Sequence, residues 1–262
     1  MKNISTIWLA VVLLFWSCER PAEHTAQSVS KAKHAPHWAY TGKEDPAHWA
    51  MLSPEFIKCA EGHGQSPIDI RTNGANPTAS ARHIVFHYRP SLLDIINNGH
   101  TIQASYQQAS FIQIGDRFFD LKQFHFHTPS EHALNGKKFP MELHLVHADA
   151  NGELAVVGIF IQEGEQNPAF QPIWEHLPAH ADEHFQLNLQ VDVHKFLPAD
   201  HDTYRYEGSL TTPPCTEGVH WYVMGQPISM SSSQIGKFQR LFENNCRPLQ
   251  PLYDRKILAV QE

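Results

Sequence analysis

Two histidines two positions apart, His125 and His127, have the clearest capacity for chemistry in this chain. They stand in the run Gln-Phe-His-Phe-His at residues 123–127, where each follows a phenylalanine. Successive side chains of a β-strand point to opposite faces, so both imidazoles would share one face and both phenyl rings the other. Two imidazoles on one wall with an apolar backing could hold a metal ion in a cavity.

A second segment, Glu-Leu-His-Leu-Val-His at residues 142–147, offers a third imidazole from a neighbouring strand. In a strand Glu142 and His144 share one face and His147 lies on the other, so His144 is the candidate ligand. Three neutral nitrogen ligands and one open position are the form of a catalytic zinc site. Cobalt or iron could occupy the same nitrogens.

Two polar residues could orient these rings, because each stands two positions before a histidine and shares its face. Gln123 precedes His125, and Glu142 precedes His144. Metal-bound histidines usually donate their second N–H to an amide, carboxylate or carbonyl, which fixes the ring. The chain has 19 histidines, however, so the pair could also be a solvated or core feature, and Glu142 a solvent-facing strand residue.

Composition favours one globular domain and argues against a nucleic-acid partner. The chain has 262 residues, 42% of them hydrophobic, which is enough for one large core. Its net charge is −7 with no long basic run, whereas a phosphate-binding surface needs clustered Lys and Arg. The 14 glycines and 18 prolines fit a chain with many turns.

Residues 1–17 have the features of a signal peptide. Lys2 supplies the positive end, and residues 7–16 form an apolar run too short for a membrane-spanning helix, which needs about 20 residues. Cys18 follows as in a bacterial lipoprotein, whose cysteine carries lipid, although the residues before it are bulkier than usual. Plain secretion and an uncleaved anchor are the alternatives. Residues 18–36 are expected to form a flexible tether, and the protein is expected to be exported, either periplasmic or attached to the outer membrane.

The chain from residue 37 onward is rich in short apolar or alternating runs separated by turn residues. Helices are predicted at 168–177 and 234–242, the second near a capping box of Ser231 and Gln234. The run 154–161 is almost wholly apolar, as in a central strand buried on both faces. A mostly β protein with minor helices follows, with strands predicted at 83–88, 92–96, 101–106, 111–114, 123–128, 141–147, 154–161 and 219–224.

Six motifs stand at residues 64–70, 97–100, 123–132, 142–147, 208–219 and 247–252, within a match that runs from Trp38 to about Leu252, nearly the whole mature chain. They begin with Gly-Gln-Ser-Pro-Ile-Asp-Ile and Asn-Asn-Gly-His, and they include Gly-Ser-Leu-Thr-Thr-Pro-Pro-Cys and Arg-Pro-Leu-Gln-Pro-Leu. In this order they resemble the α-class carbonic anhydrases of the bacterial, exported kind. The resemblance implies a single α+β domain at residues 37–262, built on a large central, mainly antiparallel twisted β-sheet with short peripheral helices.

The resemblance implies reversible hydration of carbon dioxide to bicarbonate and a proton. A zinc ion would be bound by His125, His127 and His144, and a hydroxide on it would attack the carbon of CO2, the standard example of zinc catalysis. Thr211 matches the family's gatekeeper threonine, which accepts a hydrogen bond from that hydroxide and donates one to a buried carboxylate, matched by Glu131. This chain of bonds would orient the hydroxide toward the substrate.

Other matched positions would bind the substrate and move its proton. His100 matches the family's proton-shuttle histidine, and an imidazole with a pKa near 6.5 can accept and release protons at neutral pH. Tyr40, Asn98 and Gln103 match positions that order or flank the connecting waters, although Gln103 replaces the usual asparagine. The substrate would meet an apolar wall and one hydroxyl that contacts bicarbonate, which together are Val146, Val156, Leu210, Trp221 and Thr212.

Four cysteines are present, at positions 18, 59, 215 and 246. An exported protein can form disulfides, and if Cys18 carries lipid, spacing leaves three pairings of the others open. The resemblance implies the pair Cys59–Cys215, with Cys246 as a buried free thiol.

Two alternative functions would use the same scaffold. One is a catalytically inactive binding module, although such relatives have lost metal histidines that are present here. The other is an ester hydrolase that uses the same zinc hydroxide. The expected partners are CO2 and bicarbonate, with no nucleic acid and with membrane contact only through the lipid, in a monomer or a dimer. His132 and His147 are expected to be structural.

Overall fold

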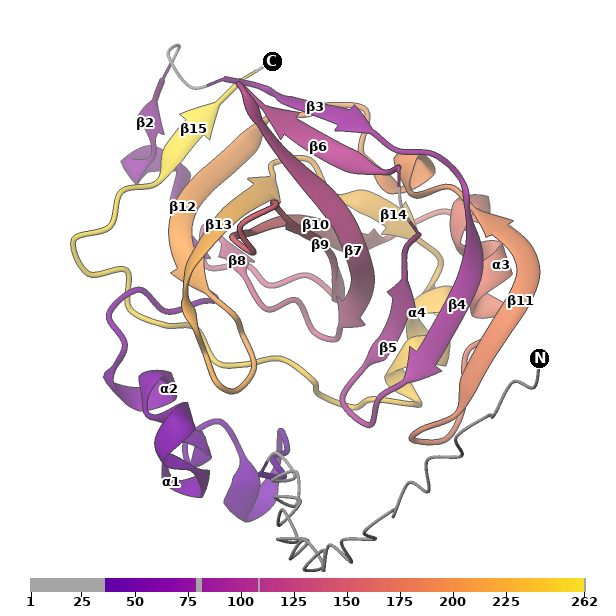
Figure 1. Cartoon of the computed structure of the whole chain (residues 1–262), viewed down its shortest axis with the longest axis horizontal. Coiled ribbons are helices and arrows are strands. Elements are labelled where there is room, and N and C mark those ends of the chain that lie inside the picture. The colour runs from indigo at the N-terminus through magenta and orange to yellow at the C-terminus, as the bar shows by residue number, and fades with distance from the viewer. Residues whose placement is uncertain (1–35, 79–81, 108, 262) are drawn as a thin grey trace, which may run out of the picture. The chain divides into compact units, whose positions relative to one another are not determined.

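The computed structural model describes residues 36–78, 82–107 and 109–261, which belong to one compact unit (Figure 1). The predicted signal peptide, Cys18 and nearly all of the tether lie outside the described residues. Within the described ranges, no helix is long and apolar enough to cross a membrane.

A 13-stranded sheet forms the framework of this unit (Figure 1). Most neighbouring strands are antiparallel, but β10 (Leu154–Glu163) is parallel to β13 (Glu217–Met224) and to β14 (Ile228–Met230), and β15 (Leu258–Val260) is parallel to β2 (Asn76–Pro77). The prediction of a mostly β domain around a large, mainly antiparallel sheet is confirmed. The main path of the sheet is β11 (His184–Val191), β4 (Ser91–Asn97), β5 (Ile102–Ser105), β7 (Arg117–His127), β9 (Met141–Ala148), β10 (Leu154–Glu163), β13 (Glu217–Met224), β12 (Thr203–Ser209), β15 (Leu258–Val260) and β2 (Asn76–Pro77).

Shorter strands extend this sheet or lie beside it. Three of them pair off the main path, namely β3 (Ile84–His87), β6 (Phe111–Ile114) and β14 (Ile228–Met230). Two others, β1 (Asp69–Ile70) and β8 (Ala133–Leu134), form a separate parallel pair. All eight predicted strands are present. The strands that were not predicted are β1, β2, β8, β11, β12, β14 and β15.

The helices are short and peripheral, as predicted. The capping box is confirmed: the Ser231 hydroxyl accepts from the N–H of Gln234, whose side chain accepts from the Ser231 N–H, and the helix starts at Ser232. The helix predicted at 168–177 is only a 3₁₀ turn followed by one α turn that ends at Trp174. The α-helices are α1 (Trp49–Leu52), α2 (Lys58–Glu61), α3 (Gln171–Trp174) and α4 (Ser232–Gln239), and the 3₁₀ turns are Gly42–Glu44, Pro54–Phe56, Thr72–Gly74, Pro168–Phe170 and Val193–Phe196.

A register shift in β7 decides which face its histidines occupy. The pairing with β9 shifts after Leu121. Before the shift Phe119 and Leu121 pack in the large core, and after it Phe124 and Phe126 do. Because a shift of one residue exchanges the two faces of a strand, both histidines of β7 point away from that core. Strict alternation from Phe119 would have buried them in it.

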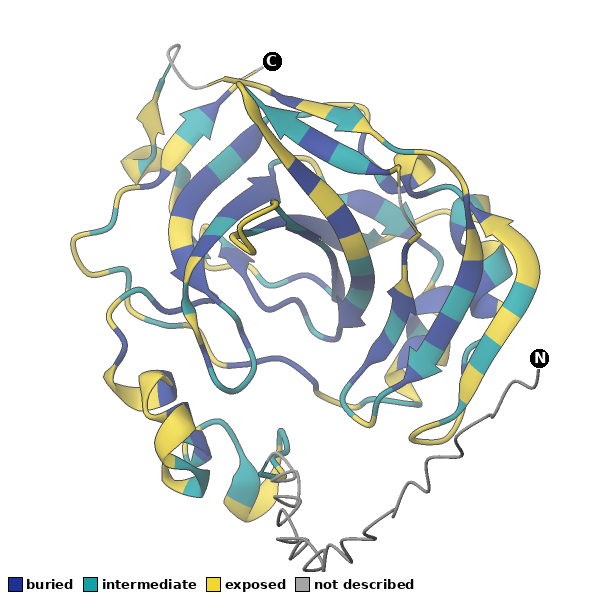
Figure 2. Ribbon diagram, in the orientation of Figure 1, coloured by how far each residue is buried: buried dark blue, intermediate teal, exposed yellow. Residues whose placement is uncertain are grey.

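Apolar clusters cover both faces of the central strands (Figure 2). Along β10, Val157 and Ile159 belong to the larger cluster, while Val156 and Phe160 belong to a second one. The prediction that this strand is buried on both faces is confirmed. The second cluster also contains Trp221, so the predicted substrate wall is part of it.

Candidate metal centre

The pairing of β7 and β9 brings three imidazoles together. His125 lies directly opposite His144, and His127 follows two positions along the same face of β7. One nitrogen of each ring lies within 4.8 Å of the other two. His147 instead lies on the other face of β9, where its Nε2 forms a 2.8 Å hydrogen bond with the hydroxyl of Tyr88. The three predicted ligands therefore converge without it.

The two predicted orienting residues contact the rings that they precede. Nδ1 of His125 donates to Oε1 of Gln123 at 2.8 Å. Nε2 of His144 donates to Oε1 of Glu142 at 2.9 Å. Because both acceptors lack a proton, each hydrogen bond selects the tautomer whose other nitrogen carries a lone pair. That second nitrogen is available to bind a metal ion.

Asn245, which was not predicted from the sequence, orients the ring of His127. Its backbone carbonyl accepts a hydrogen bond from Nδ1 of His127 at 2.7 Å. Nε2 of His127 is buried and has no hydrogen-bond partner among the described residues. A buried polar atom without a partner is costly unless a ligand satisfies it. The donor set, three imidazole nitrogens each oriented from behind, fits a metal ion.

Burial and repulsion between neighbouring rings favour the neutral form of His125 and His127, the form in which an imidazole binds a metal ion. Burial first, and then the nearby His127 and His144, lower the pKa of His125 well below its ordinary value. Burial likewise lowers the pKa of His127. For Glu142 burial alone would raise the pKa, but the attraction of His132 and His144 and their hydrogen bonds lower it well below the ordinary value.

His132 belongs to a hydrogen-bond network behind the three candidate ligands. Its backbone N–H and its ring Nδ1 both donate to Glu142, at 2.8 and 2.7 Å. Its Nε2 accepts from the hydroxyl of Tyr206 at 2.6 Å. His132, Glu142 and His144 are also close enough to hold a metal ion, but these hydrogen bonds account for their arrangement.

A cavity of about 160 Å³ opens beside the three imidazoles. Trp38 and Thr101 line it in addition to the predicted residues, and neither was identified from the sequence. Glu131 and Glu142 lie behind the cavity wall, fully buried. The predicted residues that line it, apart from the three imidazoles, are Tyr40, Asn98, His100, Gln103, Gln123, Val146, Val156, Leu210, Thr211, Thr212 and Trp221.

Glu131 has one engaged and one unengaged carboxylate oxygen. Its Oε1 accepts from the backbone N–H of Arg247 at 2.9 Å. Its Oε2 lies 3.5 Å from Nε2 of His127 and 4.0 Å from Nδ1 of His144. That oxygen has no hydrogen-bond partner in the described part of the chain, so the expected bond from Thr211 to it is not formed here. An acceptor nevertheless remains beside the cavity wall.

His100 is held in the cavity wall by a turn and a stacked ring. Oδ1 of Asn98 accepts from the backbone N–H of His100 at 3.0 Å, and Gly99 between them has a φ of 82°, which favours glycine. The imidazole stacks on Trp38, with ring centroids 3.7 Å apart and planes 8° apart. Burial first, and then His37, lower the pKa of His100 from its ordinary value.

Asn245 also connects the turn of His100 to the candidate ligand His127. Its side-chain Nδ2 donates to the carbonyls of His100 and Phe126, each at 3.0 Å. One residue thus braces both the proposed proton path and the ring of His127. Asn245 stands two positions before the motif at 247–252, and its closeness to that motif could have identified it from the sequence. Cys246, between them, is a buried free thiol, as expected.

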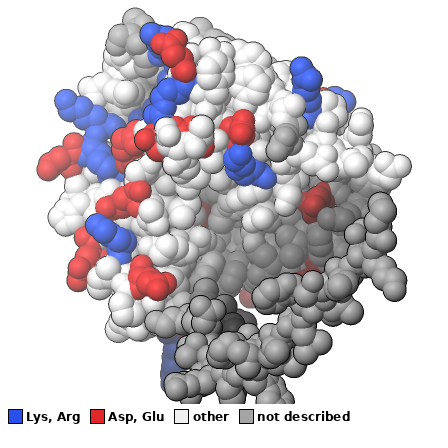
Figure 3. Space-filling model, in the orientation of Figure 1, with Lys and Arg blue, Asp and Glu red and all other residues white. Residues whose placement is uncertain are grey.

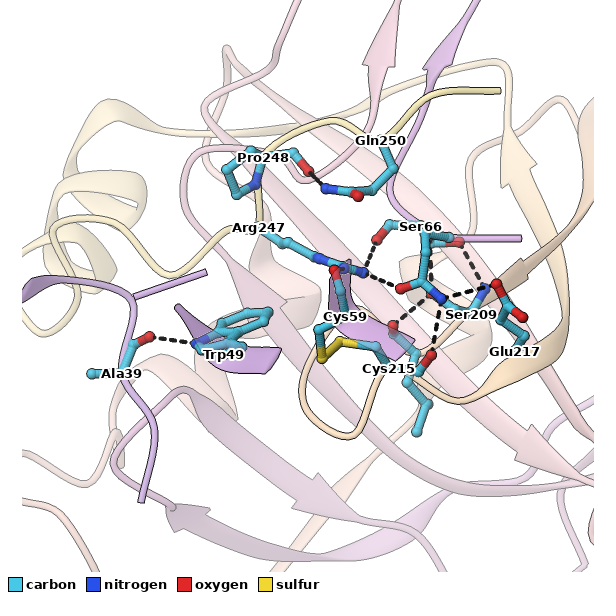
Figure 4. The surroundings of a disulfide bond; sticks show 12 residues. Ala39, Trp49, Cys59, Ser66, Ser209, Cys215, Glu217, Arg247, Pro248 and Gln250 are labelled. Carbon is cyan, nitrogen blue, oxygen red and sulfur yellow. Dashed lines mark hydrogen bonds between the residues drawn. A yellow bond between two sulfur atoms is a disulfide. The ribbon is translucent and has the colours of Figure 1, made fainter. Parts of the chain in front are cut away.

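A disulfide between Cys59 and Cys215 fastens the loop that carries the predicted threonines (Figure 4). The N–H of Cys215 donates to the carbonyl of Thr212 at 2.9 Å. On the other side of the bridge, the guanidinium of Arg247 donates to the carbonyls of Cys59 and Ser66, at 2.7 and 2.8 Å. The pairing that the resemblance implied is the one present.

Comparisons with known proteins agree with this geometry. The sequence model of the eukaryotic-type carbonic anhydrases matches residues 44–261. A carbonic anhydrase of Nostoc sp. is 45% identical over 226 residues, which cover 85% of this chain and 86% of that protein. A structure of dioscorin complexed with ascorbate is 30% identical with a TM-score of 0.80, and covers 86% of this chain and 98% of its own.

A solved complex of the α-carbonic anhydrase from Thermovibrio ammonificans with the inhibitor sulfanilamide is 42% identical, with a TM-score of 0.83. The match covers 86% of this chain and 100% of that one. The family model and each of these three relatives therefore match more than four fifths of this chain. The chain belongs to the α-class carbonic anhydrase family and is a carbonic anhydrase, an enzyme that hydrates carbon dioxide.

Proposed function

We propose that this carbonic anhydrase acts through a zinc ion held by His125, His127 and His144. The observation that carries the proposal is Nε2 of His127, a buried nitrogen without a hydrogen-bond partner among the described residues, on a ring that lies close to those of His125 and His144. Three neutral ligands leave the full charge of a divalent cation in place. Zinc bound there would supply a Lewis acid that lowers the pKa of a coordinated water, for which carbonic anhydrase is the standard example.

Thr211 and Glu131 would orient the reactants. A hydrogen bond from the Thr211 hydroxyl to Oε2 of Glu131, an oxygen without a hydrogen-bond partner among the described residues, would use the only proton of that hydroxyl. The hydroxyl could then only accept hydrogen bonds from a group in the cavity. A reactant that must donate its proton to Thr211 presents its lone pairs elsewhere, toward the substrate.

The apolar wall favours carbon dioxide as the substrate. Val146, Val156, Leu210 and Trp221 line one cavity of about 160 Å³ beside the imidazoles. An apolar surface can bind small uncharged CO2, which needs no hydrogen bonds when it leaves water. Bicarbonate is charged and needs a polar partner, which the hydroxyl of Thr212 would provide. The small volume disfavours esters, and the retention of all three ligands disfavours an inactive binding module.

His100 would carry the proton out of the cavity. It is half-buried, it lines the cavity, and Tyr40, Asn98 and Gln103 line the same space. Waters held by these polar groups could connect the imidazole to the reaction centre. The stack on Trp38 would fix the ring at the start of that path.

Replacing His100 with alanine should lower turnover in weak buffer by roughly tenfold or more, because a positioned acid–base group is lost. Added imidazole should restore part of the rate. Burial lowers the pKa of His100 below 6.5, so the wild-type ring still accepts protons somewhat below that pH. The difference in turnover between wild type and His100→Ala should therefore persist somewhat below pH 6.5 and disappear as the pH falls further and the ring becomes protonated. Stopped-flow measurement of CO2 hydration across pH checks this.

A matched control for this variant is His194→Ala, which removes an exposed histidine on a distant 3₁₀ turn. It should leave the rate in weak buffer unchanged. Equal rates for wild type and His100→Ala in weak buffer would contradict the shuttle role.

We also propose that the enzyme is exported and carries lipid on Cys18. Support comes from the apolar run that precedes this cysteine and from the Cys59–Cys215 disulfide, which fits an oxidising compartment. Intact-mass measurement of the membrane-fraction protein should find a mature chain that starts at Cys18 and carries acyl mass. A soluble product that starts at another residue would refute the anchor.

A further inference from the structure

A second cavity, of about 530 Å³, lies beside β12, β13 and β15. Of the described residues that line the two cavities, only Trp221 lines both. Arg205 and Glu207 alternate along β12 with Tyr206, and they pair across the sheet with Tyr222 and His220 of β13. The mechanism proposed above does not use this space.

Arg205 is a buried cation in this cavity with no carboxylate partner among the described residues. Its side chain is only 8% exposed. Nε donates to the hydroxyl of Thr203 at 3.0 Å, and Nη1 donates to the carbonyl of Arg82 at 2.6 Å. Burial of a charge without a counter-ion is costly. Such a charge favours binding of an anion that would neutralise it.

Donor groups remain free in the cavity wall. Nη2 of Arg205 forms no hydrogen bond with the described residues, and neither does the hydroxyl of Tyr222, a residue only 9% exposed. Neither atom is sealed from solvent, so both can reach a ligand. The guanidinium lies over the ring of Tyr222, at 5.1 Å from its centroid, and both residues line this cavity.

The charges around this cavity favour an anion although the whole chain has a net charge of −7. The cationic side chains that line it are Arg82, Arg205 and Lys256. The one lining carboxylate, Glu207, is engaged by Nδ1 of His220 at 2.7 Å. Figure 3 shows Lys and Arg side chains next to carboxylates over β12 and β15. Lys256 forms no ion pair with the described residues, and Arg82 forms only an exposed one with Asp116.

The rest of the wall is apolar. Ile114 and Leu258 line the cavity together with Tyr222. The volume lies in the range of pockets for small organic molecules, roughly 300–1,000 Å³, and exceeds what an inorganic anion would fill. A ligand that satisfies both the donors and the apolar wall has an anionic head and a hydrophobic body.

We propose that this cavity binds a small organic carboxylate, with its head on Arg205, Tyr222 and Lys256 and its apolar body against Ile114 and Leu258. Hydrogen bonds between a guanidinium and a carboxylate are charge-assisted and are among the stronger polar contacts in proteins. The site is independent of the metal centre, so its occupancy can be measured without reference to carbon dioxide hydration.

Titration of the zinc-loaded enzyme with benzoate, followed by amide chemical shifts, tests the proposal. Saturable shifts are expected at Arg205, Tyr222 and Leu258, whereas shifts at Thr211 and Thr212 would report binding in the metal-site cavity. A shift at Trp221 would not distinguish the two sites, because this residue lines both cavities. Acetate, which lacks the apolar body, should bind at least roughly tenfold more weakly.

Two variants and a control locate the head group. Arg205→Lys, which keeps the charge but not the donor geometry, should weaken benzoate binding at the second cavity by roughly tenfold. Lys256→Gln alters an exposed residue and should therefore fold normally and weaken binding by a few-fold. The matched control is Lys195→Gln, an exposed lysine on the 3₁₀ turn Val193–Phe196, which should bind benzoate like wild type.

Three results would overturn the proposal. One is the absence of shifts at Arg205, Tyr222 and Leu258 at saturating benzoate. Another is equal affinity for acetate and benzoate, which would exclude a role of the apolar wall. The third is equal benzoate affinity of Lys256→Gln and Lys195→Gln, which would exclude the cationic rim.

Discussion

Zinc binding and carbon dioxide hydration should both be lost when His144 is replaced with alanine. Two imidazoles cannot hold the ion as three do, and a bound metal ion contributes several kcal/mol to such a reaction. The rate should therefore fall by about 10³-fold or more. Zinc content by elemental analysis and hydration by stopped-flow, measured on the same preparation, check both parts of the expectation.

The matched control is His147→Gln, because His147 lies on the opposite face of β9 only three positions away. Glutamine retains the capacity to bond with Tyr88, which contacts His147 at 2.8 Å. This variant should keep one zinc ion per chain and near-normal hydration. A full zinc complement in His144→Ala, or its loss in His147→Gln, would contradict the assignment of faces.

Removal of the Cys59–Cys215 disulfide should have the largest effect on stability. The bridge closes a loop with a sequence separation of 156 residues. In the chain-entropy account a loop of that length contributes about 5 kcal/mol to the free energy of unfolding. For a domain of this size the double variant Cys59→Ala/Cys215→Ala should melt roughly 10–20 °C lower. Calorimetry and urea unfolding measure both quantities.

Cys246→Ser is the control for that experiment, since it changes a buried cysteine outside the bridge. It should alter the free energy of unfolding by only about 1 kcal/mol. An equal loss of unfolding free energy in Cys246→Ser and in the double variant would contradict a stabilising contribution of the bridge itself. Because the bridge fastens the loop of Thr212, the double variant should also lose activity at a lower temperature.

Much of the fold was predictable because hydrophobic periodicity marks strands locally. The apolar run in β10 and the capping box of α4 both depend on residues close in sequence, and both predictions are confirmed. β11 was missed although its polar and apolar residues alternate over His184–Val191. Most of its side chains are not buried, because β11 lies at the edge of the sheet. Its sequence therefore shows only a weak difference in hydrophobicity between the two faces of the strand.

The convergence of the three imidazoles followed from strand alternation within short segments. The register shift after Leu121 could not be predicted from the alternation of side chains, because the shift depends on how β7 pairs with β9. Asn245 and Trp38 were missed for a related reason. Each contacts His127 or His100 from more than 60 positions away in the chain, and only the fold brings such residues together.

Removal and return of the metal tests the zinc mechanism most directly. Stopped-flow carbon dioxide hydration should be measured on the purified enzyme, after chelation, and after addition of zinc to the metal-free protein. We expect activity to disappear with the metal and to return in proportion to zinc, reaching its full value at one ion per chain. Activity that persists in metal-free protein would contradict a catalytic site built on His125, His127 and His144.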